Sequence, residues 1–207
     1  MHVQIDHPCV QHKLAIIRDV ETGHKRFREL ATEITKFLCY EALKHIETKE
    51  VDVETPLATA KCHKIDTDIV VVPILRAGVG MLEGILELVP TARVGFVGLY
   101  RDEETKLPVS YYERFPPQVN GGTCILIDPM LATGGTTAAA IDVLKKQGAS
   151  KIVVICIVTC AEGLGLVETA HPDVPIYTAS IDDRLDENKY IVPGLGDAGD
   201  RLFGTSH

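Results

Sequence analysis

Short apolar runs alternate with amphipathic segments along most of this chain, and this alternation constrains the fold more than any other feature. Three runs stand out, at residues 69–75, 124–127 and 152–159. Runs of about four to eight apolar residues are typical of strands buried on both faces of a sheet. Helix-like segments lie between them, around 81–88 and 134–147. The order predicts an α/β fold with a mostly parallel central sheet and helices on both faces.

Weaker patterns predict the remaining elements. A long amphipathic helix is expected at 24–46, because its apolar residues follow helical spacing. Further expected elements are strands at 93–100, 123–127 and 175–178 and a helix at 162–170. Residues 1–22 and the last 27 residues show no periodic pattern and are expected to be irregular, with a polar connection and an edge strand at 47–67. The polar segment 101–117, which contains Tyr111 and Tyr112, is expected to be a long excursion.

Length and charge narrow the class of protein. The chain has 207 residues, which predicts a single domain over 1–207. Its formal net charge is −8, which argues against a surface that binds nucleic acid or an anionic membrane. Aromatic residues make up 5% of the chain and tryptophan is absent, so a platform that stacks on nucleic-acid bases is not expected.

The six cysteines do not form a recognisable metal or disulfide pattern. They stand at positions 9, 39, 62, 124, 156 and 160, without a Cys-x-x-Cys pair. Buried structural thiols are therefore expected. The first residues lack a basic region followed by a long apolar run, and no apolar stretch is long enough to span a membrane. These observations predict a cytoplasmic protein.

The segment Cys124-Ile-Leu-Ile-Asp-Pro-Met-Leu-Ala-Thr-Gly-Gly-Thr-Thr137 carries the strongest chemical signal. An apolar strand ends at Asp128, a turn of small residues follows, and a helix begins near Gly134. Small residues let backbone N–H groups approach a phosphate, and the helix directs its positive end toward the same place. The segment matches neither the Gly-Lys-Ser/Thr phosphate loop nor the Gly-x-Gly-x-x-Gly fingerprint. The pattern therefore predicts phosphate binding outside the nucleoside triphosphate and dinucleotide classes.

The same segment resembles the phosphoribosyl pyrophosphate (PRPP) motif of the type I phosphoribosyltransferases. Most members have two adjacent acids there, and Pro129 in place of the second is the variant of the uracil phosphoribosyltransferase branch. Three further segments resemble that branch: 72–78 its diphosphate loop, 98–105 with Tyr111 and Tyr112 its flexible excursion, and 190–204 its uracil-binding tail. The resemblance extends over about residues 3–205.

The resemblance implies a glycosyltransferase of pyrimidine salvage, which converts uracil and PRPP to UMP and diphosphate. Mg²⁺ is implied as cofactor, held mainly by PRPP and not by a dedicated set of protein ligands. The implied catalytic residues are Asp128, Arg101 and Asp197. The implied PRPP-binding residues are Arg76, Arg101, Asp128, Pro129, Met130, Leu131, Ala132, Thr133, Gly134, Gly135, Thr136 and Asp197. The implied uracil-binding residues are Ile191, Gly196, Asp197 and Ala198.

Several alternatives stay open at this stage. A phosphoribosyltransferase with another base specificity, or a PRPP-sensing regulatory protein, would share the phosphate segment. Met130 and Leu131 suit either a wall of the site or ordinary packing, and Tyr111 and Tyr112 suit either a closing excursion or a dimer contact. No histidine lies in the four motifs, so a strong general base is not expected. A homodimer or higher homo-oligomer is expected, with GTP as a possible allosteric activator, as in some family members.

Overall fold

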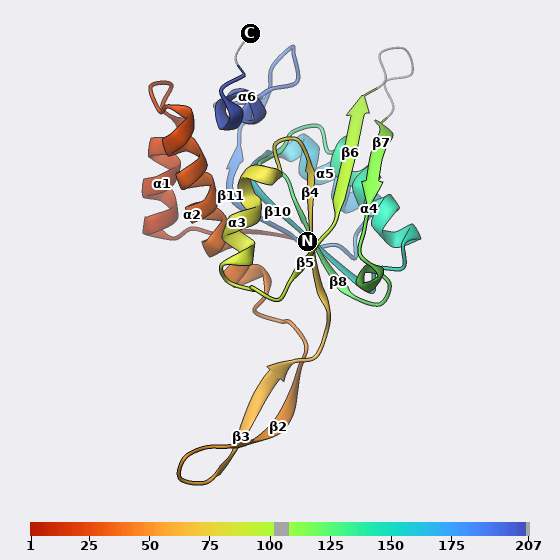
Figure 1. The fold of residues 1–207 in the computed structure, drawn as a ribbon. Helices are drawn as coiled ribbons and strands as arrows, with labels where there is room; N and C mark the ends of the chain where they lie inside the picture. The colour runs from red at the N-terminus through yellow and green to blue at the C-terminus, as the bar shows by residue number, and fades with distance from the viewer. Residues whose placement is uncertain (102–107, 206–207) are drawn as a thin grey trace.

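The fold has a central sheet between two layers of helices (Figure 1). The computed structural model describes residues 1–101 and 108–205, apart from the side chains of Arg101 and Pro108. One helical layer contains α1 (Pro8–Arg18), α2 (His24–Ala42) and α3 (Val79–Leu86), and the other contains α4 (Gly135–Lys146) and α5 (Ala161–Ala170). The predicted α/β architecture, with helices on both faces of the sheet, is confirmed.

The sheet is parallel at every pairing except one. Its main path runs in the order β1 (His2–Gln4), β11 (Ile176–Asp182), β10 (Lys151–Cys160), β8 (Thr123–Ile127), β4 (Ile69–Leu75), β6 (Phe96–Arg101) and β7 (Pro108–Arg114). Short strands β5 (Arg93–Val94) and β9 (Met130–Leu131) pair with β4 and β10. The exception in this sheet, among the residues that the structure describes, is the antiparallel pair of β6 and β7. The mostly parallel sheet that the sequence predicts is therefore confirmed.

Alternate residues of the central strands enter two separate cores. In β8, Ile125 and Ile127 pack with the layer of α1, α2 and α3, whereas Cys124 and Leu126 pack with the layer of α4 and α5. A strand that is covered on both faces needs apolar residues at every position. This requirement is why β4, β8 and β10 read as continuous apolar runs in the sequence.

The prediction that residues 1–22 are irregular is wrong, because these residues form β1 and α1. Helix α1 begins with Pro8 at its first position, and the His7 side chain caps it by accepting from the Cys9 backbone N–H at 3.1 Å. Proline suits a first helical position because its missing N–H has no helical partner there. Val10 and Ile17 of this helix are fully buried.

Helix α2 begins at His24 and ends at Ala42, four residues before the predicted end at residue 46. The chain then turns, and the Leu43 N–H donates to the Cys39 carbonyl at 2.9 Å while the Ile46 N–H donates to the Leu43 carbonyl at 3.0 Å. Ile46 still packs on the core from this turn. The residues of this turn keep the apolar spacing of a helix. The apolar periodicity of the sequence therefore extends beyond Ala42, where the helix ends.

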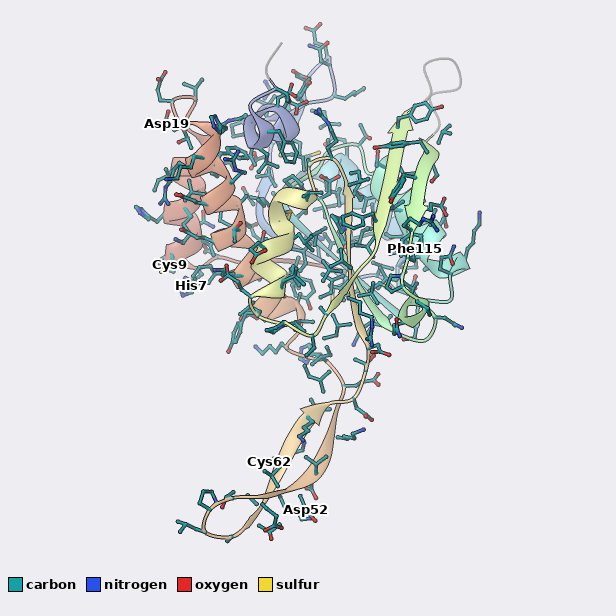
Figure 2. All side chains as sticks on the ribbon, in the orientation of Figure 1. His7, Cys9, Asp19, Asp52, Cys62 and Phe115 are labelled. Carbon is teal, nitrogen blue, oxygen red and sulfur yellow. The ribbon has the colours of Figure 1, made fainter. Side chains whose placement is uncertain are left out.

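Segment 47–67 contributes no edge strand to the sheet, contrary to the prediction. It forms a separate antiparallel hairpin of β2 (Thr48–Glu54) and β3 (Thr59–Ile65), in which Val51 lies opposite Cys62. The hairpin projects from the body, and Figure 2 shows Asp52 and Cys62 on it, away from the other elements. One face carries half-buried Val51, Val53, Ala60 and Cys62, and the other residues are exposed.

The C-terminal segment is also more ordered than predicted. It forms a small antiparallel pair of β12 (Arg184–Leu185) and β13 (Ile191–Val192), followed by the short helix α6 (Ala198–Phe203). Six residues are too few for a periodic pattern to show, so this helix was not predicted. Within the predicted excursion, β7 and the 3-10 turn at Pro117–Val119 are described, and residues 102–107 lie outside the described part.

Four of the six cysteines are buried, as expected for structural thiols. Burial raises the pKa of Cys39, Cys124 and Cys156 to about 12, so these thiols stay protonated near neutral pH. Cys9 is exposed, however, and Cys62 is half-buried on the hairpin. In the part of the chain that the structure describes, no helix is both long and apolar enough to cross a membrane.

Candidate functional site

The carboxyl ends of β4 and β8 bring two predicted motifs to the same edge of the sheet. The strands pair in parallel, with Pro73 opposite Ile127. The turn that contains Arg76 and the turn that begins at Asp128 therefore leave the sheet side by side. Open α/β sheets bind ligands at this edge, where the chain diverges above the strands.

Asp128 occupies the centre of this edge. It is half-buried, and its carboxylate accepts a long hydrogen bond from the Met130 backbone N–H at 3.4 Å. Burial disfavours the charged form and raises the pKa of Asp128 to about 7, while the bond from Met130 lowers it slightly. A carboxyl group with a pKa near neutrality in a cavity is a typical functional-site group.

The turn after Asp128 is fixed by β10 and α5. Thr159 Oγ1 donates to the Leu131 carbonyl at 2.9 Å, and Cys160 Sγ donates to the Ala132 carbonyl at 3.2 Å. Gly163 packs so closely that a Cβ there would lie 2.4 Å from the Ala132 carbonyl oxygen. These three residues position the turn, yet sequence reasoning did not identify them, because they follow it by about 30 residues.

The end of this turn forms the N-terminus of α4. Gly134 is the residue before the helix and has a positive φ of 81°, which glycine adopts without steric cost. The first N–H groups of an α-helix lack partners within the helix, and the helix dipole makes that end positive. Residues 132, 133, 135 and 136 are half-buried here. The arrangement can hold an anion such as a phosphate.

The C-terminal segment closes over this edge and completes a cavity of about 230 Å³. Seven of the predicted site residues line it: Asp128, Met130, Ala132, Ile191, Gly196, Asp197 and Ala198. Four lining residues were not predicted: Ala77, Lys189, Tyr190 and Gly199. The structure thus brings part of the phosphate segment and the whole predicted uracil-binding set to one cavity.

Other predicted residues lie outside the cavity lining. Leu131 is 1% exposed and packs in the core, and Pro129 is buried, with its carbonyl accepting from the Ile157 and Val158 N–H groups. Thr133, Gly134, Gly135 and Thr136 belong to the turn and the helix start described above. The Arg101 side chain lies outside the described residues, although its backbone ends β6.

Arg76 and Asp197 connect the diphosphate-loop segment to α6. The Arg76 side chain is 62% exposed, and its Nη2 lies 3.5 Å from Asp200 Oδ1. Asp197 caps α6, because its Oδ1 accepts from the Asp200 N–H at 2.9 Å. The peptide bond before Arg76 is cis. An exposed and loosely held guanidinium beside the cavity is available to a phosphate oxygen.

Lys189 reaches the cavity from a tight turn in which its backbone φ is 69°. Asp186 builds this turn: its side chain accepts from the Asn188 N–H at 2.9 Å and from the Tyr190 N–H at 2.8 Å. A left-handed backbone costs a non-glycine residue roughly 1–2 kcal/mol. The hydrogen bonds of Asp186 impose this strained conformation on Lys189.

Replacing Lys189 by glycine should therefore raise the free energy of unfolding by about 0.5–1 kcal/mol, after allowance for the greater freedom of glycine in the unfolded chain. Urea unfolding measures the change. The matched control is Lys146→Gly in the last turn of α4, where glycine should lower stability by up to about 1 kcal/mol. A loss of stability at both positions would contradict a strained Lys189.

A second hollow, of about 400 Å³, lies against α2 and is lined mainly by apolar surface of residues such as Phe37, Tyr40 and Leu88. It is larger than the cavity at Asp128. However, no residue of the four motifs lines it. We therefore assign the chemistry to the smaller cavity, where a carboxyl with a raised pKa and a helix N-terminus converge.

Known proteins are similar to this chain over almost its whole length. A family model described as uracil phosphoribosyltransferase matches residues 3–205. A curated uracil phosphoribosyltransferase of Symbiobacterium thermophilum is 52% identical over 204 residues, which cover 98% of each chain. The solved structure of protein AQ2163 from Aquifex aeolicus has a TM-score of 0.93 at 40% identity, covering 100% of this chain and 99% of the other.

A more distant structure supports the fold alone. It is the adenine phosphoribosyltransferase of Trypanosoma brucei, solved with AMP, pyrophosphate and ribose-5-phosphate. Its TM-score is 0.61 at 14% identity, with coverage of 91% of this chain and 87% of the other. The architecture is therefore that of the type I phosphoribosyltransferases.

Proposed function

Because this chain belongs to the uracil phosphoribosyltransferase family, we propose that it transfers the 5-phosphoribosyl group of PRPP to uracil, giving UMP and diphosphate. The chain is thus a glycosyltransferase of pyrimidine salvage. The observation that carries the proposal is the cavity in which Asp128 and the segment around Gly196 face the same space. A reaction that joins a phosphoribosyl group to a base needs both subsites in contact.

Backbone groups of the C-terminal segment bind the base in this proposal. Uracil presents two carbonyl acceptors and one N3–H donor, and cytosine reverses this pattern at its position 4. Ile191, Gly196 and Ala198 line the cavity, where backbone N–H and C=O groups cannot rotate to suit the wrong base. A site that leaves buried polar groups unpaired with a mismatched ligand discriminates strongly against it.

Asp128 and the following turn hold the ribose 5-phosphate. The Asp128 carboxylate accepts from ribose hydroxyls, and the backbone of 132–136 with the start of α4 binds the 5-phosphate. Thr133 and Thr136 add hydroxyl donors to the same anion. The backbone of Pro129 and Leu131 serves by shaping the turn, since both side chains are buried.

Arginine side chains receive the departing diphosphate. Arg76 gives up its exposed contact with Asp200, since an exposed ion pair contributes little free energy. Arg101, at the end of β6, supplies the second guanidinium in this proposal. Closure of the segment 101–117 over the substrates would exclude water, but this expectation falls partly on residues outside the described part of the chain.

Mg²⁺ carried by PRPP would supply charge neutralisation at the departing diphosphate. Asp128 and Asp197 are the carboxylates that line the cavity and are therefore the chain's own candidates to meet the ion. Among the described residues, no group of three or more His, Cys, Asp or Glu side chains is arranged to hold a metal.

The chain acts as one domain within a homo-oligomer in this proposal. The β2–β3 hairpin supports the oligomer, because an isolated two-stranded hairpin is marginally stable and this one leaves Val51 and Cys62 only half-buried. Tyr111 and Tyr112 remain open to either a dimer contact or closure. Activation by GTP and a cytoplasmic location stay predictions from the sequence.

The direct test incubates the protein with PRPP, Mg²⁺ and one base at a time. We expect diphosphate release with uracil and at least about 100-fold slower release with cytosine, because the mismatched base leaves polar groups unpaired. Hypoxanthine and orotate serve as controls for another base specificity. Turnover of either in place of uracil would overturn the proposal, and PRPP binding without diphosphate release would favour a regulatory protein.

A further inference from the structure

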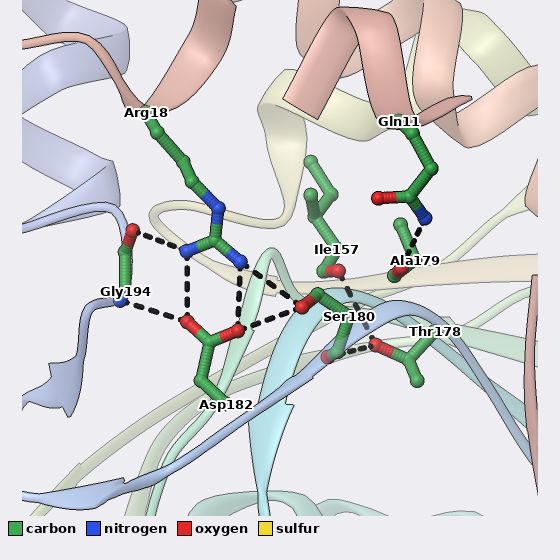
Figure 3. Close-up of polar contacts among 8 residues, drawn as sticks. All are labelled: Gln11, Arg18, Ile157, Thr178, Ala179, Ser180, Asp182 and Gly194. Atoms are coloured by element: carbon green, nitrogen blue, oxygen red, sulfur yellow. Dashed lines mark hydrogen bonds and ion pairs between the residues drawn. The ribbon is translucent and has the colours of Figure 1, made fainter. Parts of the chain in front are cut away.

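Two charged side chains from distant parts of the sequence meet behind the cavity. Arg18 ends α1, and Asp182 ends β11, 164 residues later. Figure 3 shows their fork-to-fork pairing: Arg18 Nη1 donates to Asp182 Oδ2 at 2.8 Å and Nη2 donates to Oδ1 at 2.7 Å. The Asp182 side chain is 3% exposed, so this ion pair is largely shielded from water.

The pair holds both backbone polar groups of Gly194. Asp182 Oδ2 accepts from the Gly194 N–H at 2.8 Å, and Arg18 Nη1 donates to the Gly194 carbonyl at 2.8 Å (Figure 3). Gly194 has a positive φ of 60°, and a Cβ there would lie 2.0 Å from the Ile191 carbonyl oxygen. The backbone at Gly194, which the ion pair holds by hydrogen bonds, therefore folds tightly back on Ile191.

A second arginine, which lies in the C-terminal segment, also connects that segment to the N-terminal helices. Arg201 of α6 donates from Nη1 to the Leu195 carbonyl at 2.9 Å and from Nη2 to the Asp19 carbonyl at 2.5 Å. Its guanidinium also lies over the Phe27 ring, 4.5 Å from the ring centroid. Residues 194 and 195 are thus held to α1 and α2 from two sides, while 191 and 196–198 on either side of them line the cavity.

Stability alone does not account for a buried ion pair in this place. Removing two charges from water is costly, and apolar residues of the same size often stabilise a fold as well or better. Burial by itself would raise the pKa of Asp182, but the bonds from Arg18, Ser180 and Gly194 outweigh burial and hold that pKa below its ordinary value. A directional, bidentate pair fixes position as well as distance.

We propose that Arg18 and Asp182 are positioning residues for base recognition: together they fix Gly194 and thereby set the backbone groups of Ile191 and Gly196–Ala198 at the spacing that uracil requires. The inference rests on the proposed function, since it concerns the base subsite of that reaction. It places the specificity for the base partly in the N-terminal helix, which has no lining residue in the cavity.

The test compares the effect of each substitution on KM for uracil with its effect on KM for PRPP. Arg18→Gln and Asp182→Asn should each raise KM for uracil by about tenfold or more, because small displacements of binding groups have large effects. KM for PRPP should change less than about twofold, since Asp128 and the α4 turn are held by other contacts. Arg18→Lys keeps the charge but not the fork, so its KM for uracil should fall between wild type and Arg18→Gln.

The matched control is Gln11→Ala, which removes a hydrogen bond from α1 to the Ala179 carbonyl on β11, and Figure 3 shows this bond apart from Gly194. Both Michaelis constants should stay at their wild-type values. Hydrogen exchange of the backbone N–H groups in the segment 191–196, where Pro193 has none, provides a readout without turnover. Exchange should accelerate in Arg18→Gln and Arg18→Lys and stay unchanged in Gln11→Ala.

Three outcomes would decide against the proposal. Parallel increases in KM for uracil and PRPP would show a general loss of structure, and unchanged KM for uracil in Arg18→Lys and Asp182→Asn would show that the pair only stabilises the fold. Unchanged exchange at 191–196 would show that the pair does not fix the segment. If wild type released no diphosphate with uracil, the proposed function would fail instead, and the exchange experiment would still test the link.

Discussion

Asp128→Asn should lower kcat/KM at least about 100-fold and at the same time make the folded protein more stable above pH 7. The loss of activity follows from the position of Asp128 in the cavity, where a carboxylate is placed to accept from ribose hydroxyls. Losing one preorganised charged group at a reacting centre commonly costs a factor of about 100–1000. An asparagine keeps the shape but not the charge.

The gain in stability has a separate cause. Burial raises the pKa of Asp128 to about 7 in the folded protein, whereas an aspartate in an unfolded chain titrates near about 3.9. Between these values the folded state keeps a proton that the unfolded state has lost, so stability falls as the pH rises through this window. Asparagine does not titrate. We expect it to add about 1–3 kcal/mol to the free energy of unfolding above pH 7 and little below pH 4.

Steady-state kinetics and urea unfolding across pH 4–9 measure the two effects. The control is Asp142→Asn on the outer surface of α4, where the side chain is 64% exposed and neither effect is expected. Unchanged kcat/KM in Asp128→Asn would refute its contact with substrate. A stability difference that is the same at pH 4 and pH 8 would refute the raised pKa as its cause.

Gly163→Ala should displace the turn at residues 128–136, which binds the 5-phosphate in the proposed function. Its Cβ would lie 2.4 Å from the Ala132 carbonyl oxygen and 2.7 Å from that of Leu131, and backbone atoms cannot move aside as a flexible side chain can. Displacing the turn would raise KM for PRPP and lower kcat/KM about 100-fold. Overpacking of this kind also lowers the free energy of unfolding by about 1–3 kcal/mol.

The same helix offers a matched control at Gly165, where an added Cβ meets nothing within 4 Å. Gly165→Ala should raise stability by up to about 1 kcal/mol, since alanine favours a helix, and should leave the kinetics at wild-type values. Chemical denaturation and PRPP titration of both variants compare the two sites. Equal effects of the two substitutions would exclude the close contact of Gly163 with the turn as the cause.

The parts of the fold that the sequence predicted well are those with strong local signals. β4, β8 and β10 are buried on both faces, so each reads as an unbroken apolar run. The turn from Asp128 to Thr136 combines a strand end, small residues and a helix start within nine positions. When several such signals fall within a few residues, they determine the local structure. The resemblance to a known family rests on the same residues.

The parts that sequence reasoning missed depend on contacts between distant residues. Helix α1 has only three buried positions, Val10, Leu14 and Ile17, so its pattern is short. The β2–β3 hairpin lies outside the core, and its alternating residues Val51, Val53, Ala60 and Cys62 are only half-buried. Such a pattern indicates a strand but does not reveal that the strand pairs outside the main sheet. The pairing of Arg18 with Asp182 follows from the arrangement of α1 over β11, which no spacing in the sequence reveals.

The contact of Arg18 with Gly194 also differs in sequence separation from the contacts that hold the turn after Asp128. Arg18 and Gly194 lie 176 residues apart, whereas Thr159 and Cys160 each lie 28 residues from their partners in that turn. Closing a long loop costs more conformational entropy than closing a short one. The base subsite therefore depends on ordering residues from distant parts of the chain, and the phosphate subsite depends on a local unit of β8, β10 and α5.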